Sequence, residues 1–420
     1  MNETKKPAIR FDRFVEKWEQ REVGELLTER NDQAPMSEEY PLMAFIANEG
    51  VAPKGDRYDR SSLVSDVKNK LYKKTEKGDF IYSSNNLETG SIGLNKYGKA
   101  CISPVYSIFQ TTEIGDSEFL GRRLVRKDFI NAMVKWRQGV IYGQWRIHES
   151  DFVKIELLVP SVEEQREIGS LLDNLDSLIV HKQSKLEKLQ AIKASMLEKM
   201  FPKDGADVPE VRFKGFIGAW EQRNMDDVFV DLQNNTLSRS ELSTEKGVAR
   251  NVHYGDVLVK FGEILDLRAA SLPKITDRST VIKYKKSFLK NGDIIVADTA
   301  EDETVGKCTE IIGINNEVVI AGLHTIPYRP LIHFATGYLG YYMNSPAYHN
   351  QLLPFMQGIK VTSISKSSMR QTTIIYPQSI DEQKQIANCF REIDDLITFQ
   401  QQELNKLQSI KKALLEKMFV

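Results

Sequence analysis

Two copies of one sequence unit make up this chain, and the duplication constrains the fold more than any other feature, because copies of a sequence share a fold. Residues 7–27 read PAIRFDRFVEKWEQREVGELL, and residues 209–229 read PEVRFKGFIGAWEQRNMDDVF. A second matched pair covers residues 161–201 and residues 379–419. The offset between the copies grows from 202 residues (209 minus 7) to 218 residues (379 minus 161). The middle of the second copy is therefore about sixteen residues longer, and the middles have diverged while the ends have not.

The second matched pair predicts two long helices. Ser161 with Glu164, and Ser379 with Glu382, form Ser-x-x-Glu patterns just after a proline, which is typical of a capped helix start. Apolar residues then recur at heptad spacing, as they do in helices that pair with one another. About 39 residues at 1.5 Å each would give a helix of roughly 58 Å. The two apolar stripes of the first helix contain Ile168, Leu175, Leu189 and Met196, and Leu172, Ile179, Leu186 and Met200.

The distribution of charge favours antiparallel pairing of these helices. The first half of each helix is rich in acidic residues, and the second half is rich in lysine. Antiparallel pairing places acids opposite bases, whereas parallel pairing places like charges together and adds a small penalty for each pair. We therefore expect an antiparallel coiled coil, with separate packing of each helix on its own domain as the alternative.

The diverged middles, residues 22–158 and 224–376, predict a mixture of strands and short helices. Apolar runs bounded by turn residues, such as residues 255–259, indicate strands. Helical patterns occur near residues 118–136 and 334–355. The expected fold class is α+β, with two similar globular domains separated by two long antiparallel coiled-coil helices. The expected segments are a first domain at 1–158, a helix at 159–201, a second domain at 202–376 and a helix at 377–420.

Composition excludes several classes of protein. Hydrophobic residues make up 41% and charged residues 27% of the chain, with 57 basic and 58 acidic side chains, which excludes a disordered or collagenous chain. No run approaches the roughly 18 apolar residues of a membrane span, and the N-terminal segment lacks the apolar core of a signal peptide, so we expect a cytoplasmic protein. Cys101, Cys308 and Cys389 have no metal-binding spacing and are expected to be buried packing residues.

The common catalytic motifs are missing from the sequence. It contains no GxxxxGK[ST] phosphate loop, no nucleophile elbow and no HExxH. The aspartates Asp79, Asp256 and Asp293 follow glycines and are interpreted as turn residues rather than metal ligands. We therefore expect no catalytic residues, no metal site and no cofactor bound by this chain.

Two segments at matching positions are poor in acidic residues. Seven basic residues between Phe119 and His148 meet one acid, Asp128, and no Asp or Glu occurs from Val318 to Ile380. A surface that faces DNA requires this depletion, because carboxylates repel phosphates, while Arg, Lys, Ser, Thr and Gln bind phosphates or base edges. An ordinary solvated surface is the alternative.

The candidate DNA-contact residues fall into two grades. The phosphate-facing candidates are Lys135, Arg137 and Arg146 in the first domain, and Lys360, Lys366 and Arg370 in the second. The further candidates for contact with bases or sugars are Tyr142, Gln144 and Trp145 in the first domain, and Thr362, Ser363 and Ser365 in the second.

The matched ends carry a resemblance to a known family. Each copy has Phe-x-x-Phe-x-x-x-Trp-Glu-Gln-Arg, at residues 11–21 and 213–223, and a helix that starts with Glu-Gln-x-x-Ile, at residues 164–168 and 382–386. Together with a Leu-x-Lys-Leu-Gln-x-Ile-Lys helix end, this pattern resembles the specificity subunit of type I restriction-modification enzymes. The resemblance covers essentially the whole chain.

The resemblance implies a sequence-specific DNA-binding subunit without catalytic activity. It implies two target recognition domains, each recognising one half of a split, asymmetric site, and two helices that act as a ruler between them. It also implies two bound methyltransferase subunits, restriction subunits within the same complex, and S-adenosylmethionine, ATP and Mg on those partners. Two other functions stay open at this point: a duplicated coiled-coil adaptor that binds only proteins, and a self-contained nuclease or methyltransferase.

Overall fold

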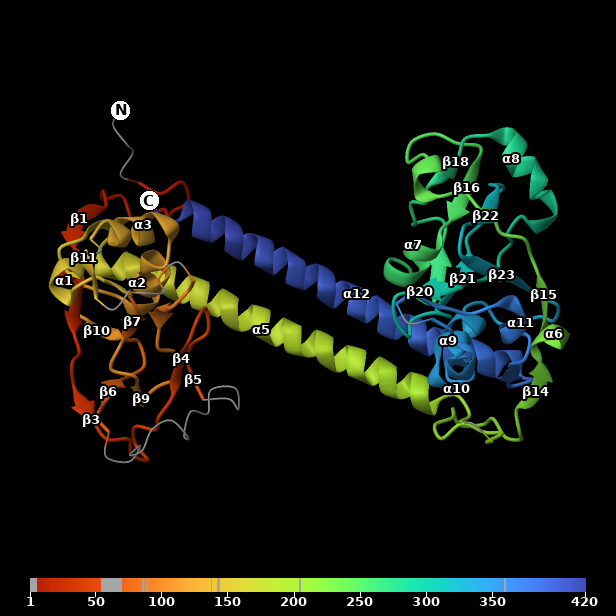
Figure 1. Cartoon of the computed structure of the whole chain (residues 1–420), viewed down its shortest axis with the longest axis horizontal. Helices are drawn as coiled ribbons and strands as arrows, with labels where there is room; N and C mark the ends of the chain where they lie inside the picture. The colour runs from red at the N-terminus through yellow and green to blue at the C-terminus, as the bar shows by residue number, and fades with distance from the viewer. Residues whose placement is uncertain are drawn as a thin grey trace. The chain divides into compact units, whose positions relative to one another are not determined.

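The chain divides into two compact units in its computed structural model. The structure describes residues 6–53, 70–84, 87, 89–136, 138–141, 144–203, 205–358 and 360–420. One unit consists of residues 1–183 with 403–420, and the other consists of residues 184–402. Each unit contains a domain of strands and short helices, together with parts of two 38-residue helices, α5 (Val162–Lys199) and α12 (Ile380–Lys417) (Figure 1). The fold class is α+β with a duplicated domain, as expected.

Antiparallel sheets form the domain of the first unit. Within the described residues, the larger sheet has the strand order β2-β10-β7-β8, a smaller sheet has the order β3-β6-β9, and β1-β13, β4-β5 and β11-β12 are strand pairs. The strands are β1 (Glu19–Glu22), β2 (Leu27–Glu29), β3 (Gln33–Ala34), β4 (Ala44–Ile46), β5 (Gly50–Ala52), β6 (Tyr72–Thr75), β7 (Phe80–Tyr82), β8 (Ile92–Leu94), β9 (Ala100–Ile102), β10 (Ser107–Thr111), β11 (Gln138–Ile141), β12 (Gln144–Arg146) and β13 (Glu156–Val159). The short helices are α1 (Val23–Leu26), α2 (Ser117–Leu124), α3 (Lys127–Lys135) and α4 (Glu149–Phe152).

The domain of the second unit is larger and mixes parallel with antiparallel pairing. Its main sheet has the order β15-β23-β19-β21-β17, a second sheet has the order β18-β16-β22, and β14-β25 and β20-β24 are strand pairs. The strands are β14 (Glu221–Asn224), β15 (Phe229–Asp231), β16 (Ala249–Val252), β17 (Ile264–Asp266), β18 (Lys274–Ile275), β19 (Ile294–Ala297), β20 (Thr299–Ala300), β21 (Cys308–Ile312), β22 (Val319–Ala321), β23 (Thr325–Pro330), β24 (Thr362–Ser363) and β25 (Thr373–Tyr376). The helices are α6 (Met225–Val228), η3 (Arg239–Glu241), α7 (Tyr254–Val259), α8 (Arg278–Lys283), η4 (Lys285–Ser287), α9 (Tyr338–Asn344), α10 (Pro346–His349), η5 (Leu353–Phe355) and α11 (Lys366–Met369).

The strand predicted at residues 255–259 is wrong, because this segment forms helix α7. The ring nitrogen of His253 accepts a hydrogen bond from the Gly255 N–H and caps the helix, while Val257 is buried. A short apolar run fits either a strand or a buried helical turn, and here the cap decides between them.

Each matched Glu-Gln pair at a helix start holds the domain to the helix. Glu164 forms two hydrogen bonds of 2.7 Å with Arg10, and Glu382 forms hydrogen bonds of 2.6 and 2.9 Å with Arg212. Both carboxylates are buried, so the paired arginine is what makes their burial tolerable. The capping-box prediction is therefore wrong for these glutamates: the serines do accept helix N–H groups, but the glutamates pair with arginines instead.

The glutamines of the two Glu-Gln pairs, Gln165 and Gln383, form hydrogen bonds that connect each helix start to its domain. The Gln165 side chain accepts a hydrogen bond from the Asp116 N–H and donates to the carbonyls of Ile114 and Pro160. In the other unit the Gln383 side chain accepts from the Ala335 N–H and donates to the Pro377 carbonyl. Each glutamine therefore ties a loop of the domain to the helix start, which accounts for its presence in both copies.

Each long helix begins in one unit and ends in the other, and the phenylalanine just past its end packs into the core of the unit in which it ends. In the first unit Phe419, just past α12, stacks on Phe119, which contacts Trp18. In the second unit Phe201, just past α5, stacks on Phe390 and contacts Trp220. The matched tryptophans and the phenylalanines that follow the two helices are thus core residues of the two units.

The two chain ends meet within the first unit. The Ile9 N–H donates a hydrogen bond of 3.0 Å to the Lys417 carbonyl. The matched bond in the second unit runs from the Val211 N–H to the Lys199 carbonyl, at 2.9 Å, across a continuous linker.

Matched ion pairs show the direction of the helices within each unit. In the first unit the Lys411 Nζ of α12 lies 2.5 Å from the Asp176 Oδ1 of α5. In the second unit the Lys193 Nζ of α5 lies 2.7 Å from the Asp394 Oδ1 of α12. The start of each helix is therefore beside the end of the other, and the expected antiparallel pairing is confirmed.

Candidate DNA-contact surfaces

The first-domain candidates that the structure describes lie on β12 and at the end of α3. Lys135 is the exposed last residue of α3, and Gln144, Trp145 and Arg146 form β12, which pairs antiparallel with β11. Arg137 and Tyr142 lie outside the described residues.

Other basic residues of the same stretch serve the fold. The Arg122 guanidinium lies 2.6 Å from Glu118 and 2.9 Å from Asp176 of α5. Arg123 is buried beside Asp128, at 2.8 Å, and burial lowers the pKa of its guanidinium. The Arg126 guanidinium donates to the Leu415 carbonyl. These three cations therefore do not contribute to a free basic surface.

In the second domain Arg370 and Lys366 have internal partners. The Arg370 Nη2 lies 2.6 Å from Asp231, and its Nε lies 3.5 Å from Asp226; the hydrogen bond to Asp231 raises the pKa of Arg370. The Lys366 Nζ donates a hydrogen bond of 3.1 Å to the Leu232 carbonyl. Lys360 is exposed and has no ion pair among the described residues.

Thr362 and Ser363 lie beside acidic residues that are distant in the sequence. They form β24, which pairs with Thr299 and Ala300 of β20. The loop after β20 brings Asp302 and Glu303 into one shallow pocket with Thr362. The segment from Val318 to Ile380 is poor in acids as a sequence, but its surroundings in the fold are not.

Ser365 has a local structural role. Its hydroxyl accepts a hydrogen bond of 3.1 Å from the Ser368 N–H and caps helix α11. Ser363 remains exposed.

The second domain has one further basic surface, which was not among the predicted candidates. Helix α8, the turn η4 and the residues after them expose five cations, and none of their charged groups has a hydrogen bond or ion pair in the described part of the chain. The signal was available, because no acidic residue occurs from 278 to 292. These cations are Arg278, Lys283, Lys285, Lys286 and Lys290.

The aspartates of the two Gly-Asp turns are structural, as predicted for them. Asp79 accepts a hydrogen bond from the Glu76 N–H, and Asp293 accepts one from the Lys290 N–H. Asp293 also pairs with Arg329, at 2.7 Å, and Asp79 pairs with Arg30, at 2.9 Å. Burial raises the pKa of both carboxyls. The third aspartate, Asp256, lies instead in the first turn of α7.

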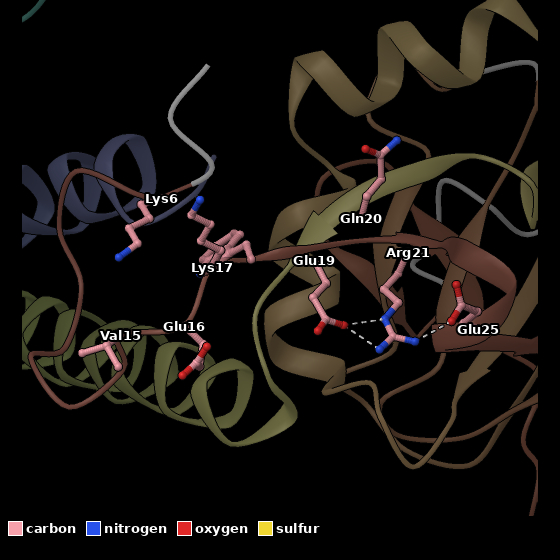
Figure 2. Close-up of a pocket in the computed structure, with 9 residues that line it drawn as sticks. Lys6, Val15, Glu16, Lys17, Glu19, Gln20, Arg21 and Glu25 are labelled. Carbon is pink, nitrogen blue, oxygen red and sulfur yellow. Dashed lines mark hydrogen bonds and ion pairs between the residues drawn. The ribbon is translucent and has the colours of Figure 1, made fainter. Parts of the chain in front are cut away.

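An open pocket beside β1 contains the exposed part of the Trp-Glu-Gln-Arg motif. Figure 2 shows Arg21 between Glu19 and Glu25, with the guanidinium 2.6 Å from Glu19 and 2.8 Å from Glu25. The hydrogen bond to Arg21 lowers the pKa of Glu25. Exposed pairs of this kind contribute little to stability.

Other chemistry in the described chain is limited. Cys101 and Cys308 are buried as predicted, whereas Cys389 is only partly buried. Within the residues that the structure describes, no helix has the length and apolarity to cross a membrane. In that same part of the chain, no three acidic, histidine or cysteine side chains gather as a metal site requires.

Comparison with known proteins identifies the class. Matched ends around diverged middles define a duplicated recognition protein. A family model described as the type I restriction modification DNA specificity domain matches residues 15–191 and again residues 218–409. The chain belongs to this family and is the DNA-recognition component of a type I restriction-modification system rather than one of its catalytic subunits.

Related proteins agree with this assignment. The specificity subunit of the type I restriction enzyme MjaVIII from Methanocaldococcus jannaschii is 23% identical over 428 residues, which covers 96% of this chain and 92% of that protein. The S subunit of a type I restriction-modification system from M. genitalium has a similar fold, with a TM-score of 0.56 at 13% identity and 99% coverage of both chains. A chain from a structural study of type I system assembly matches with a TM-score of 0.50 at 16% identity, over 96% of this chain and 97% of that chain.

Proposed function

We propose that this specificity subunit recognises a bipartite, asymmetric DNA sequence, with one half contacted by each domain. The recognition domains are residues 1–158 and 202–376, and the helical segments 159–201 and 377–420 set the distance between the half-sites. The observation that carries this proposal is the contrast between matched structural ends and diverged middles. Buried motif residues keep the two units alike, while a four-stranded sheet in one domain and a five-stranded sheet in the other present different surfaces.

The helices have the length that a spacer needs. Each continuous helix has 38 residues, which corresponds to about 57 Å at 1.5 Å per residue. One turn of duplex DNA is about 34 Å, so a spacer of this length suits half-sites more than one turn apart.

Two methyltransferase subunits are the partners that we propose for the helices. Leu178 and Leu396 are exposed at matched positions, by 42% and 49%, and Ile192 and Ile410 are likewise exposed, by 49% and 40%. Exposed positions of a paired helix are normally polar, so matched apolar residues indicate a protein surface that is covered in the complex. Each unit carries one leucine and one isoleucine of this set, which supports two equivalent binding surfaces.

The remaining components follow from this arrangement. Restriction subunits join through the complex, and S-adenosylmethionine, ATP and Mg are bound by the partner subunits. Because the substrate is cellular DNA, the complex works in the cytoplasm.

Methylome sequencing tests the proposed target. Cells that express the chain with its methyltransferase should carry methylated adenines in one motif with two unlike halves and a fixed gap. A continuous or symmetric motif would contradict the proposal. A chain that binds methyltransferase but shows no sequence-selective, salt-dependent retention on DNA would support the adaptor function instead.

Apolar-to-charged substitutions test the proposed partner surfaces. Leu178→Asp and Leu396→Asp should each remove one bound methyltransferase subunit, and the double variant should remove both, because a charge would be buried in the interface. Native mass spectrometry of the purified complex measures the ratio. Ser195→Asp, at an exposed polar position of α5, is the matched control and should keep both subunits. Full occupancy in the double variant would refute this surface.

A further inference from the structure

Helix α8 and turn η4 form a well-packed segment at one edge of the second domain. Val281 of α8 is buried in a cluster with Ala249, Ile275 and Ile320. The Asp277 carboxylate accepts hydrogen bonds of 3.0 Å from the N–H groups of Ser279 and Thr280 and caps the helix. The buried cluster around Val281 and the Asp277 cap therefore hold this segment in place. Its exposed side chains are not needed for folding.

The exposed side chains of this segment are strongly basic. We call their surface the α8–η4 face and define it by Arg278, Lys283, Lys285, Lys286 and Lys290, which are all exposed. The capping carboxylate of Asp277 is the one acidic group in residues 277–292, so the segment carries a local charge of about +4. Exposed Ile282 lies one helical turn from Arg278 on α8.

Other cations of this domain behave differently. Arg250 lies 2.8 Å from Glu317, Arg329 lies 2.7 Å from Asp293, and Arg239 contacts Asp256. Their charges are neutralised within the fold, and Arg370 is paired in the same way. None of the five cations of the α8–η4 face forms an ion pair in the described structure, and the Asp293 carboxylate that acts electrostatically on Lys290 is already paired with Arg329. An unneutralised cluster of this kind repels itself and gains most from an external polyanion.

We propose that the α8–η4 face binds the phosphate backbone of the DNA beside the half-site that the second domain recognises. This inference rests on the proposed function, and it assigns the main electrostatic contact to residues outside the acid-poor segment 318–380. Ile282 is exposed in the same segment and would contact deoxyribose. Such contacts carry affinity and orientation rather than sequence information.

Salt-dependent binding of the full-length chain tests the inference. The probe is a fluorescent duplex that contains the motif found by methylome sequencing, and affinity is measured between about 50 and 200 mM salt. The variant Lys283→Ala, Lys285→Ala, Lys286→Ala, Lys290→Ala should bind at least tenfold more weakly at low salt. The slope of log K against log salt should fall by about 0.9 for each phosphate that the variant no longer neutralises, with the methylated motif unchanged. The matched control changes the same four lysines to arginine and should keep the wild-type slope.

Three outcomes would overturn the inference, and they are distinguishable. Sequence-selective binding by the wild type, with an unchanged slope in the alanine variant, would refute the phosphate contact and leave the proposed function intact. No selective binding by the wild type would refute both. A changed methylation motif in the alanine variant would also refute the inference, because phosphate contacts do not select bases.

Discussion

Glu310 shows how one buried side chain couples this fold to pH. It lies on β21 and is 2% exposed. Its carboxyl group accepts hydrogen bonds of 2.6 Å from the Gly337 N–H and 3.0 Å from the Gly340 N–H, at the start of α9. Gly337 has a φ of 89°, a conformation that favours glycine. Burial raises the pKa of Glu310 to about 7 in spite of these bonds.

We predict a pH-dependent stability difference between wild type and Glu310→Gln. The unfolded glutamate ionises near its ordinary pKa of 4.5, so the folded chain holds an extra proton from about pH 4.5 to pH 7. The stability contributed by Glu310 is complete below 4.5 and is lost as the pH rises through 7. Urea unfolding should therefore show the variant gaining about 2 kcal/mol on wild type between about pH 5.5 and pH 8. A difference that does not change with pH would contradict this.

A second residue-level prediction separates free from paired cations. Lys360→Ala should lower the salt slope of DNA binding by about one unit if its ammonium contacts a phosphate. Arg370→Ala should leave the slope unchanged, because Asp231 and Asp226 already neutralise its guanidinium. Fluorescence anisotropy at several salt concentrations distinguishes the two, and a larger effect for Arg370 would restore it as a DNA-binding residue.

At the level of elements, partly buried ion pairs specify how α5 and α12 align. Lys193 contacts Glu263 at 2.8 Å and Asp394 at 2.7 Å. Although burial opposes its charge, these two carboxylates raise the pKa of Lys193. Its counterpart Lys411 contacts Asp176, which Arg122 also neutralises. Lys193 and Lys411 interrupt the apolar stripes at matched heptad positions, so their ion pairs select one register of the antiparallel pair.

Removal of the two matched lysines should lower the free energy of unfolding by unequal amounts. Lys193→Met removes the ion pairs of both Glu263 and Asp394, and we expect a destabilisation of about 3 kcal/mol. Lys411→Met leaves Asp176 paired with Arg122, so we expect about 1 kcal/mol. Denaturant unfolding of both variants measures the difference. Equal values would show that Arg122 does not compensate in the first unit.

Across the whole molecule, each domain is joined to the rest of the chain at adjacent points. Glu22 at the end of β1 pairs with Glu156 at the start of β13, and Asn224 of β14 pairs with Thr373 of β25. The segment between the two strands of each pair therefore begins and ends at adjacent points of the fold. This geometry suits a domain whose recognition surface changes while its attachment does not.

Exchange of residues 22–158 for the corresponding segment of another specificity subunit should change one half of the methylated site and keep the other half. The reason is that both ends of the exchanged segment lie in one strand pair, β1-β13, so the second domain keeps its own core. Methylome sequencing of cells that express the chimera reports both halves. Retention of the complete parental motif would refute the assignment of this segment as a recognition domain.

Local sequence patterns were sufficient to establish the duplication, the fold class and the two long helices. Repeated helix starts and heptad stripes are signals between near neighbours, and they predicted helices at 159–201 and 377–420 where the structure has α5 and α12. The three-dimensional fold, and not the sequence, shows which cations lack an ionic partner. Arg122 and Arg370 are neutralised by Asp176 and Asp231, which are far away in the sequence, while the cations of the α8–η4 face have no such partner among the described residues. Helix signals act between neighbouring residues, but the electrostatic state of a side chain depends on distances in space, which the fold alone sets.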